Sequence, residues 1–193
     1  MSEWAKLLVD PNGDRIADAA CPRFLLPGSF DPLHDGHRGM FAAAVRRLGP
    51  GGAFELSITN AEKPSSSDDE VSRRLRAFAG YAPLWLTRAP TFVEKARLFP
   101  GAVFVVGADT AARIVQPRFY EESAERMRSA LEEIRAAGCR FLVAGRVDGE
   151  GRYIDRDALS LREEFADLFD AIAEGEFRLD VSSTALRTSV RTA

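Results

Sequence analysis

His34 and His37 are the two histidines of this chain, and they lie three positions apart in one short segment. An apolar run that ends at Gly28 precedes them, and apolar residues at helical spacing follow from Met40 to Leu48. This order predicts a strand, a glycine-containing loop and an amphipathic helix. The free N–H groups and positive dipole end of a helix N-terminus attract anions, and imidazoles can donate hydrogen bonds to phosphate oxygens. The segment therefore predicts a binding site for a chain of phosphates.

Two further segments follow predicted strands and could meet the same ligand, because ligands of open α/β sheets bind beyond the carboxyl ends of the strands. Lys63 follows the predicted strand at 53–59 and is a candidate phosphate contact, although a solvated loop lysine is the commoner case. Gly107 and Asp109 follow the predicted strand at 102–106. The glycine lets a ligand approach the backbone, and the carboxylate can accept hydrogen bonds from ribose hydroxyls. A turn or a helix cap is the alternative for Asp109.

A serine-rich segment near the end of the chain predicts a second phosphate contact. Ser182 or Ser183 is a good N-cap residue, Thr184 follows directly, and Arg187 lies about one helical turn further along. Hydroxyls, free N–H groups and a guanidinium together can bind a pyrophosphate from the side opposite the histidines. Capping alone would explain the serines but not an arginine at this spacing.

The composition excludes several other classes of protein. The chain of 193 residues is 46% hydrophobic and 28% charged, which is typical of a globular domain with a full core. Its net charge of −3 lacks the basic excess of a nucleic-acid-binding protein. No apolar run approaches the ~20 residues that span a bilayer, and the first residues lack a signal-peptide pattern, so we expect a cytoplasmic protein without a membrane partner. Cys21 and Cys139 are too few for a disulfide framework and lack metal-ligand spacing, so no metal site is expected.

Strands and helices alternate along the chain, which predicts an α/β fold: a Rossmann-like doubly wound parallel sheet of about five strands with flanking helices. Residues 1–22 are expected to form an N-terminal extension that packs as a strap with a turn at 11–14, and residues 23–193 the main domain. We expect strands at 23–28, 53–59, 84–87, 102–106, 139–144 and 177–179, a hairpin or loop at 146–154, and helices ending at 48 and spanning 70–79, 92–98, 121–137 and 159–172.

Two groups of residues have a structural and a functional interpretation. Trp85 could stack on an aromatic ligand ring, but a large aromatic residue in a strand is more often part of the core. Arg73, Arg74 and Arg76 are expected to form a solvated helix face rather than a nucleic-acid patch.

The run Gly28-Ser29-Phe30-Asp31-Pro32-x-His34-x-Gly36-His37 resembles the signature of the nucleotidyltransferases with a His-x-Gly-His motif, which transfer a nucleoside monophosphate from a nucleoside triphosphate. Together with Gly107-Ala108-Asp109 and Ser182 to Arg187, in that order, it resembles the nicotinamide- or nicotinate-mononucleotide adenylyltransferases. The chain is also similar to a branch labelled cytidylyltransferase-like, which shares runs similar to Phe54–Ser57 and Gly138–Arg146.

The resemblance implies a role for each candidate residue. His34 and His37 would contact the triphosphate and stabilise charge at the reacting α-phosphate, with Arg187 as the third catalytic group. Asp109 would hold ribose or base-side groups of the nucleotide. Gly28, Ser29 and Phe30 would line the nucleotide cleft, while Ser182, Thr184 and Arg187 would bind the β- and γ-phosphates. Gly107 and Ser183, which belong to the same motifs, and Lys63, which is a candidate by its position after a strand, complete the set of expected binding residues. The implied substrates are ATP, which carries the Mg²⁺, and a small phosphorylated acceptor, expected to be a pyridine mononucleotide.

The acceptor and the assembly are left open by the residues. The family's Pro-Ser-Tyr-Thr run corresponds here to Pro90-Thr91-Phe92-Val93, which differs at the aromatic position. One alternative is an adenylyl- or cytidylyltransferase that acts on another phosphorylated small molecule, such as phosphopantetheine with ATP or a phosphorylated alcohol with CTP. Another is a nucleotide-binding regulator without turnover. Nicotinamide against nicotinate preference is open too, as is the oligomeric state, with a homo-oligomer as one option.

Overall fold

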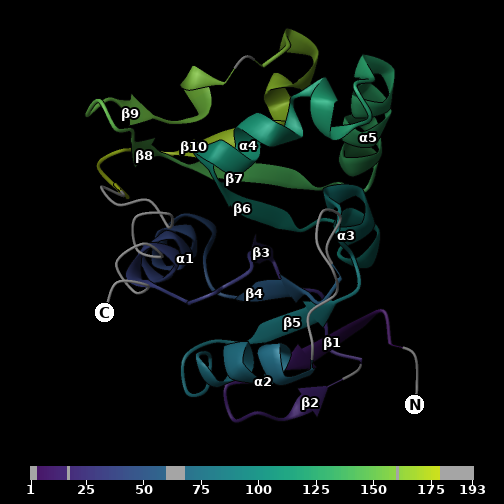
Figure 1. Ribbon diagram of the computed structural model, residues 1–193, viewed down its shortest axis with the longest axis vertical. Coiled ribbons are helices and arrows are strands. Elements are labelled where there is room, and N and C mark those ends of the chain that lie inside the picture. Colours follow the sequence, from purple (N-terminus) through teal and green to yellow (C-terminus); the bar gives the residue numbers. More distant parts are fainter. Residues whose placement is uncertain (1–3, 17, 60–67, 160, 179–193) are drawn as a thin grey trace.

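The computed structural model describes residues 4–16, 18–59, 68–159 and 161–178 (Figure 1). In these ranges, eight strands form one sheet in the order β10-β7-β6-β3-β4-β5-β1-β2. The strands from β10 to β5 are parallel, and β1 and β2 are antiparallel additions. Their bounds are β1 Lys6–Val9, β2 Arg15–Ile16, β3 Phe24–Pro27, β4 Gly52–Ser57, β5 Leu84–Thr87, β6 Val103–Gly107, β7 Arg140–Ala144 and β10 Phe169–Ile172.

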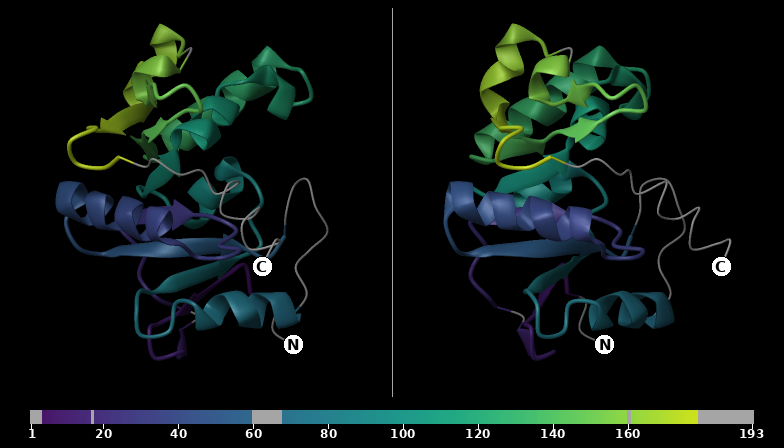
Figure 2. Two further views of the ribbon diagram at one scale, coloured as in Figure 1. Left: turned by 60° about the vertical axis from the view of Figure 1, so that its left-hand side comes forward. Right: turned by 90° about the vertical axis from the view of Figure 1, so that its left-hand side faces the viewer.

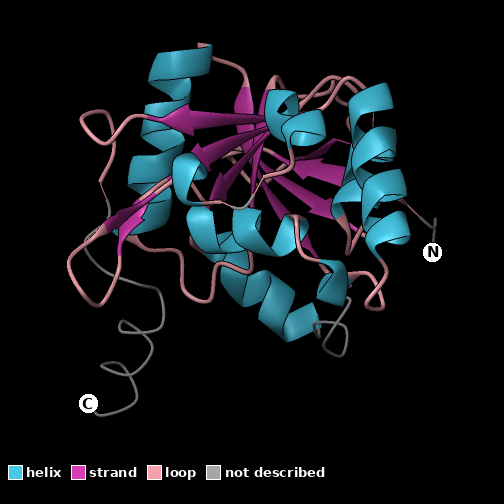
Figure 3. Cartoon of the chain, turned by 90° about the horizontal axis from the view of Figure 1, so that it is seen from above, coloured by secondary structure: helices cyan, strands magenta, loops and turns pink. Residues whose placement is uncertain are grey.

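Helices cover both faces of this sheet, as the view from above shows (Figure 3). One face packs against α1 (Asp35–Leu48) and α2 (Asp68–Arg76). The other packs against α3 (Phe92–Leu98), α4 (Ala108–Ile114) and α5 (Ala124–Ala136). Because both faces are covered, the central strands are nearly continuous apolar runs. The α/β class and the doubly wound parallel sheet are confirmed, with six parallel strands among the described residues.

The order of the strands reverses between β3 and β6. From β3 the chain moves outward through β4 and β5, then returns to place β6 on the other side of β3 and continues outward to β7 and β10. Such a reversal leaves a crevice at the carboxyl ends of the two central strands, where ligands of this kind of fold bind. The fold therefore directs attention to the segments that follow β3 and β6.

The N-terminal residues join the sheet instead of packing as a strap. β1 and β2 form a hairpin whose turn falls at 11–14 as predicted, and β1 pairs antiparallel with β5, with Leu8 opposite Trp85. Leu7 and Val9 are buried in the core. The hairpin covers what would otherwise be the exposed edge of β5, at the end of the sheet opposite β10 (Figure 2).

The predicted helix at 159–172 is wrong. The segment follows the 3₁₀ turn η2 (Arg156–Ala158), and its described part forms the 3₁₀ turn η3 (Glu163–Leu168) and then β10, which pairs in parallel with β7, with Phe169 opposite Phe141. Phe165, Leu168, Phe169 and Ile172 are all buried, so their spacing suits a turn followed by a strand as well as a helix. The free edge of β7 supplies backbone partners that favour the strand.

The predicted strand at 177–179 is not present at Phe177 and Arg178, the two of its residues that the structure describes. Arg46 donates to the backbone oxygen of Glu176 at 2.8 Å, and the Phe177 ring lies against Gly39 of α1, where an added Cβ would lie 2.9 Å from it. This segment is therefore anchored to a helix rather than to the sheet.

A buried polar cluster lies on the α3 side of β4 and β5. Glu55 of β4 is fully buried. Lys95 of α3 donates to Glu55 Oε1 at 2.7 Å and to the Ala89 backbone oxygen at 2.6 Å, and Thr87 Oγ1 donates to the same carboxylate oxygen at 2.5 Å. The charge of Glu55 is thus balanced by a lysine that is itself buried.

Candidate active site

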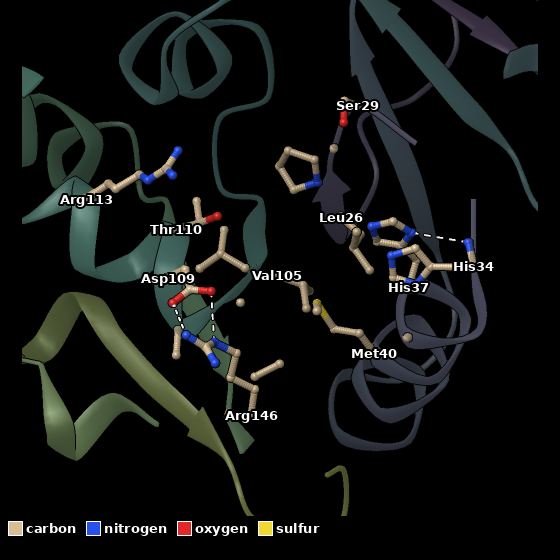
Figure 4. A pocket seen from close by; sticks show the side chains of 18 of the residues that line it. Leu26, Ser29, His34, His37, Met40, Val105, Asp109, Thr110, Arg113 and Arg146 are labelled. Atoms are coloured by element: carbon tan, nitrogen blue, oxygen red, sulfur yellow. Dashed lines mark hydrogen bonds and ion pairs between the residues drawn. The ribbon is translucent and has the colours of Figure 1, made fainter. Parts of the chain in front are cut away.

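A cavity of about 390 Å³ lies at the carboxyl ends of β3, β6 and β7, where the strand order reverses. Its volume is within the range of about 300–1,000 Å³ that small-molecule sites occupy. One wall is the loop of residues 28–34, here called the motif loop, together with the start of α1. The facing wall is formed by α4 and by Gly145 and Arg146 after β7 (Figure 4).

The motif loop is shaped by a buried aromatic ring. Phe30 has a φ of 46° and is 1% exposed, and its ring lies over Gly28, where an added Cβ would lie 2.7 Å from it. The ring also meets Phe54 and Phe78 edge-on. Gly28 and Ser29 line the cavity as expected, but Phe30 differs from the expectation, because it supports the loop from behind and is absent from the lining.

The two imidazoles lie together at the N-terminus of α1. Their rings stack with centroids 3.7 Å apart, and both line the cavity (Figure 4). The backbone N–H of His34 donates to Nδ1 of His37 at 3.3 Å. Since Nδ1 accepts, the neutral ring carries its proton on Nε2.

Burial and the neighbouring His34 ring lower the pKa of His37 to about 4. At neutral pH, His37 is therefore an uncharged hydrogen-bond donor through Nε2. Combined with the free N–H groups and positive dipole of a helix of 14 residues, it makes this wall suited to an anion.

Asp109 lies on the facing wall, where the sequence predicted it, but with an unexpected partner. Arg146 donates Nε to Oδ2 and Nη2 to Oδ1, both at 2.8 Å, so the ion pair is bidentate. This pairing raises the pKa of Arg146 above its usual value. Asp109 can still accept from a ribose through its remaining lone pairs, because each carboxylate oxygen can take more than one hydrogen bond.

Arg146 was missed by the sequence analysis, which placed it in a loop without a role. The rule that singled out Asp109, a position just beyond the carboxyl end of a parallel strand, applies equally to Arg146 after β7. Thr110 and Arg113 of α4 also line the cavity and were missed. They follow Asp109 on the same helix, and nothing in their spacing alone distinguishes them from surface residues.

Arg73 and Arg76 of α2 are exposed, as expected of a solvated helix face, but Arg73 and Arg74 also reach the motif loop. Arg73 Nη2 lies 2.9 Å from an oxygen of Asp31 in the motif loop, and Arg74 Nη2 lies 3.9 Å from the other oxygen. The Arg74 side chain is 12% exposed. Asp31 lines the cavity, so α2 contacts the motif loop through a residue of the cavity wall.

The remaining candidates divide into two groups. Trp85 is 1% exposed, packs edge-on against Phe99 and does not line the cavity, so its interpretation as a core residue is confirmed. Five predicted phosphate contacts lie outside the described residues: Lys63, Ser182, Ser183, Thr184 and Arg187.

Two wider features of the described ranges bear on the site. They hold no cluster of three or more His, Cys, Asp or Glu side chains able to ligate a metal ion. Every helix within them is too short or too polar to cross a bilayer.

Fold and cavity together define an α/β protein with a cavity at the switch point of a doubly wound sheet. The family model described as cytidylyltransferase-like matches residues 25–189, from β3 to beyond the last described residue. The chain therefore belongs to the cytidylyltransferase-like family, within the nucleotidyltransferase superfamily, whose substrates are a nucleotide and a phosphorylated small molecule. A search of curated proteins found no significant match.

Proposed function

We propose that this chain transfers AMP from ATP to nicotinamide or nicotinate mononucleotide and releases pyrophosphate, as a step of NAD synthesis. The observation that carries the proposal is the pair of stacked imidazoles at the N-terminus of α1, inside the cavity at the switch point of the sheet. The order of the three motifs in the chain supports the choice of adenylyl transfer.

The reaction needs no protein nucleophile. A phosphate oxygen of the acceptor attacks the α-phosphorus of ATP in line, a new P–O bond forms, and the bond from the α-phosphorus to the bridging oxygen breaks as pyrophosphate leaves. The attacking phosphate is already anionic and needs no strong base. Catalysis is then positioning and stabilisation of charge on the α-phosphoryl oxygens, by the Nε2–H of His37, by His34 and by the backbone N–H groups of α1.

Magnesium fits this site as a companion of the triphosphate. The two carboxylates of the described lining, Asp31 and Asp109, each face an arginine, so neither offers an unshared charge to a cation. Mg²⁺ readily keeps several waters and binds substrate phosphates, and when bound it would neutralise phosphate charge. We propose that Lys63, Ser182, Ser183, Thr184 and Arg187 contribute further phosphate contacts.

A second candidate acceptor is favoured by the chemistry of the lining. The described lining residues include no Phe, Tyr or Trp to stack on a pyridine ring. A phosphorylated acceptor without an aromatic ring, such as phosphopantetheine or a phosphorylated alcohol, would not need such a surface. This candidate keeps the same transfer chemistry and the same roles for His34 and His37.

The test incubates the purified protein and Mg²⁺ with each pairing of a triphosphate (ATP, CTP, GTP or UTP) and an acceptor (nicotinamide mononucleotide, nicotinate mononucleotide, phosphopantetheine or a phosphorylated alcohol). Pyrophosphate release and the mass of the product are measured. The proposal expects release with ATP and a pyridine mononucleotide, with the dinucleotide as product. Release only with another acceptor would replace the proposed acceptor by the second candidate. Binding of ATP in calorimetry without release from any pair would contradict the enzyme and favour a nucleotide-binding regulator.

A further inference from the structure

The charges around the cavity are unequally matched. Asp31 is opposed by Arg73, and both oxygens of Asp109 are held by Arg146. Arg113 also lines the cavity, yet among the described residues it has no carboxylate within ion-pair distance. Among the described residues, its guanidinium contacts the Phe119 ring, whose centroid lies 5.8 Å from the guanidinium carbon. The lining therefore presents a positive charge that the described residues do not neutralise.

Arg113 lies where a helix would normally supply it with a carboxylate partner. Asp109 and Arg113 are four residues apart on α4, the spacing at which an acid followed by a base normally pairs along a helix. Arg146 occupies both oxygens of Asp109 instead, in a bidentate pair stronger than a helix-surface contact. Arg113 is thereby left available to an anion from outside the protein.

The guanidinium extends from the α4 wall, across the cavity from the imidazoles (Figure 4). A substrate held between the two walls would meet the imidazoles of His34 and His37 on one side and a fixed positive charge on the other. Arginine suits a phosphate in particular, because its planar fork of N–H groups can donate two hydrogen bonds to one phosphate.

We propose that Arg113 binds a phosphate group of a substrate across the cavity from the imidazoles, and that Arg146 keeps it free by holding Asp109. The inference rests on the proposed function only for the source of that phosphate, which is the triphosphate or the phosphorylated acceptor. The anion site itself is a property of the folded chain and can be measured without turnover.

The experiment compares Arg113→Gln with Arg118→Gln by calorimetry at low salt. Arg118 is a matched control, because its guanidinium carbon lies 4.8 Å from the same Phe119 ring and it does not line the cavity. The probes are tripolyphosphate, inorganic phosphate and nicotinate mononucleotide. Loss of a charge-assisted contact should weaken binding by about tenfold or more in Arg113→Gln and leave Arg118→Gln unchanged.

The probes separate the two sources. A loss confined to tripolyphosphate assigns Arg113 to the triphosphate, and a loss with inorganic phosphate and the mononucleotide assigns it to the acceptor. Equal affinities in the two variants for every probe would overturn the proposal, as would no binding of any probe by the unchanged protein.

A separate pair of variants tests the role of Arg146. Arg146→Gln frees Asp109 to pair with Arg113 and should weaken anion binding, while Asp109→Asn in the same chain should restore it. No restoration would contradict the part assigned to Arg146. Pyrophosphate release by the unchanged protein and by Arg118→Gln tests the proposed function separately from the anion site. Anion binding that depends on Arg113, without any pyrophosphate release, would refute turnover alone. Full release by Arg113→Gln would refute the role of Arg113 in binding phosphate alone.

Discussion

Replacing His37 by asparagine or by glutamine tests whether its Nε2–H stabilises the transferred phosphoryl group. The Nδ1 atom of His37 accepts from the His34 backbone N–H at 3.3 Å, and Nε2 carries the proton that would reach the α-phosphate. Asparagine can place an oxygen near the Nδ1 position but has no donor at Nε2. Glutamine can place an amide N–H near the Nε2 position but does not reproduce the contact with His34.

The expected magnitude follows from the donor that each variant loses. Removing one preorganised donor from the position where charge develops costs about 10²–10³ in kcat, or roughly 3–4 kcal/mol. We therefore expect His37→Asn to lower kcat several hundredfold with little change in the midpoint of urea unfolding at pH 7. His37→Gln should keep a measurable part of the activity. The assay is pyrophosphate release at saturating ATP.

Two outcomes would refute this reasoning. Unchanged turnover in His37→Asn would mean that Nε2 does not touch the reacting group. Equal losses in both variants, together with equal losses of folding stability, would mean that the ring matters for the start of α1 and not for the chemistry.

Three further predictions concern stability, each measured by urea unfolding with Arg118→Gln as a neutral reference. The pKa of His37 is lowered from 6.5 to about 4, so the unfolded chain takes up the proton first as pH falls. The free energy of unfolding should therefore fall between pH 6.5 and 4, by at most about 3 kcal/mol, and His37→Asn should reduce this pH dependence. An unchanged pH dependence in the variant would contradict the burial of the neutral ring. Gly28→Ala would place a Cβ 2.7 Å from the Phe30 ring and should cost about 1–3 kcal/mol, and no cost would mean that the loop adjusts freely. Lys95→Met leaves Glu55 buried without its cation and should lower the free energy of unfolding by about 3–5 kcal/mol. Adding Glu55→Gln should reduce this loss, and equal stability of the single and double variants would argue against the ion pair.

The sequence predicted correctly those elements whose structure depends on neighbouring residues. The strand before Gly28, the helix after His37 and the strand before Gly107 were all predicted from apolar spacing and glycine positions, and the rule for carboxyl ends of parallel strands brought Gly28, His37 and Asp109 to one cavity. These predictions needed no knowledge of long-range partners.

The misses depend on contacts between distant residues. β10 exists because β7 offers it an edge, and Glu55 is buried because Lys95, 40 positions further along the chain, neutralises it. The ring of Phe30 turns behind the motif loop because of a backbone φ of 46°, which residue type does not predict. Arg146 meets Asp109 across 37 positions, so neither the pair nor the free charge of Arg113 could be read from spacing.

The most direct test of the central claim is a crystal structure of the protein with a non-hydrolysable ATP analogue and Mg²⁺. The account predicts the α-phosphate within hydrogen-bonding distance, about 3 Å, of His37 Nε2 and of backbone N–H groups at the start of α1. It also predicts the nucleoside against the wall formed by Asp109 and Arg146. A nucleotide bound elsewhere, or bound with its phosphates turned away from both imidazoles, would contradict it.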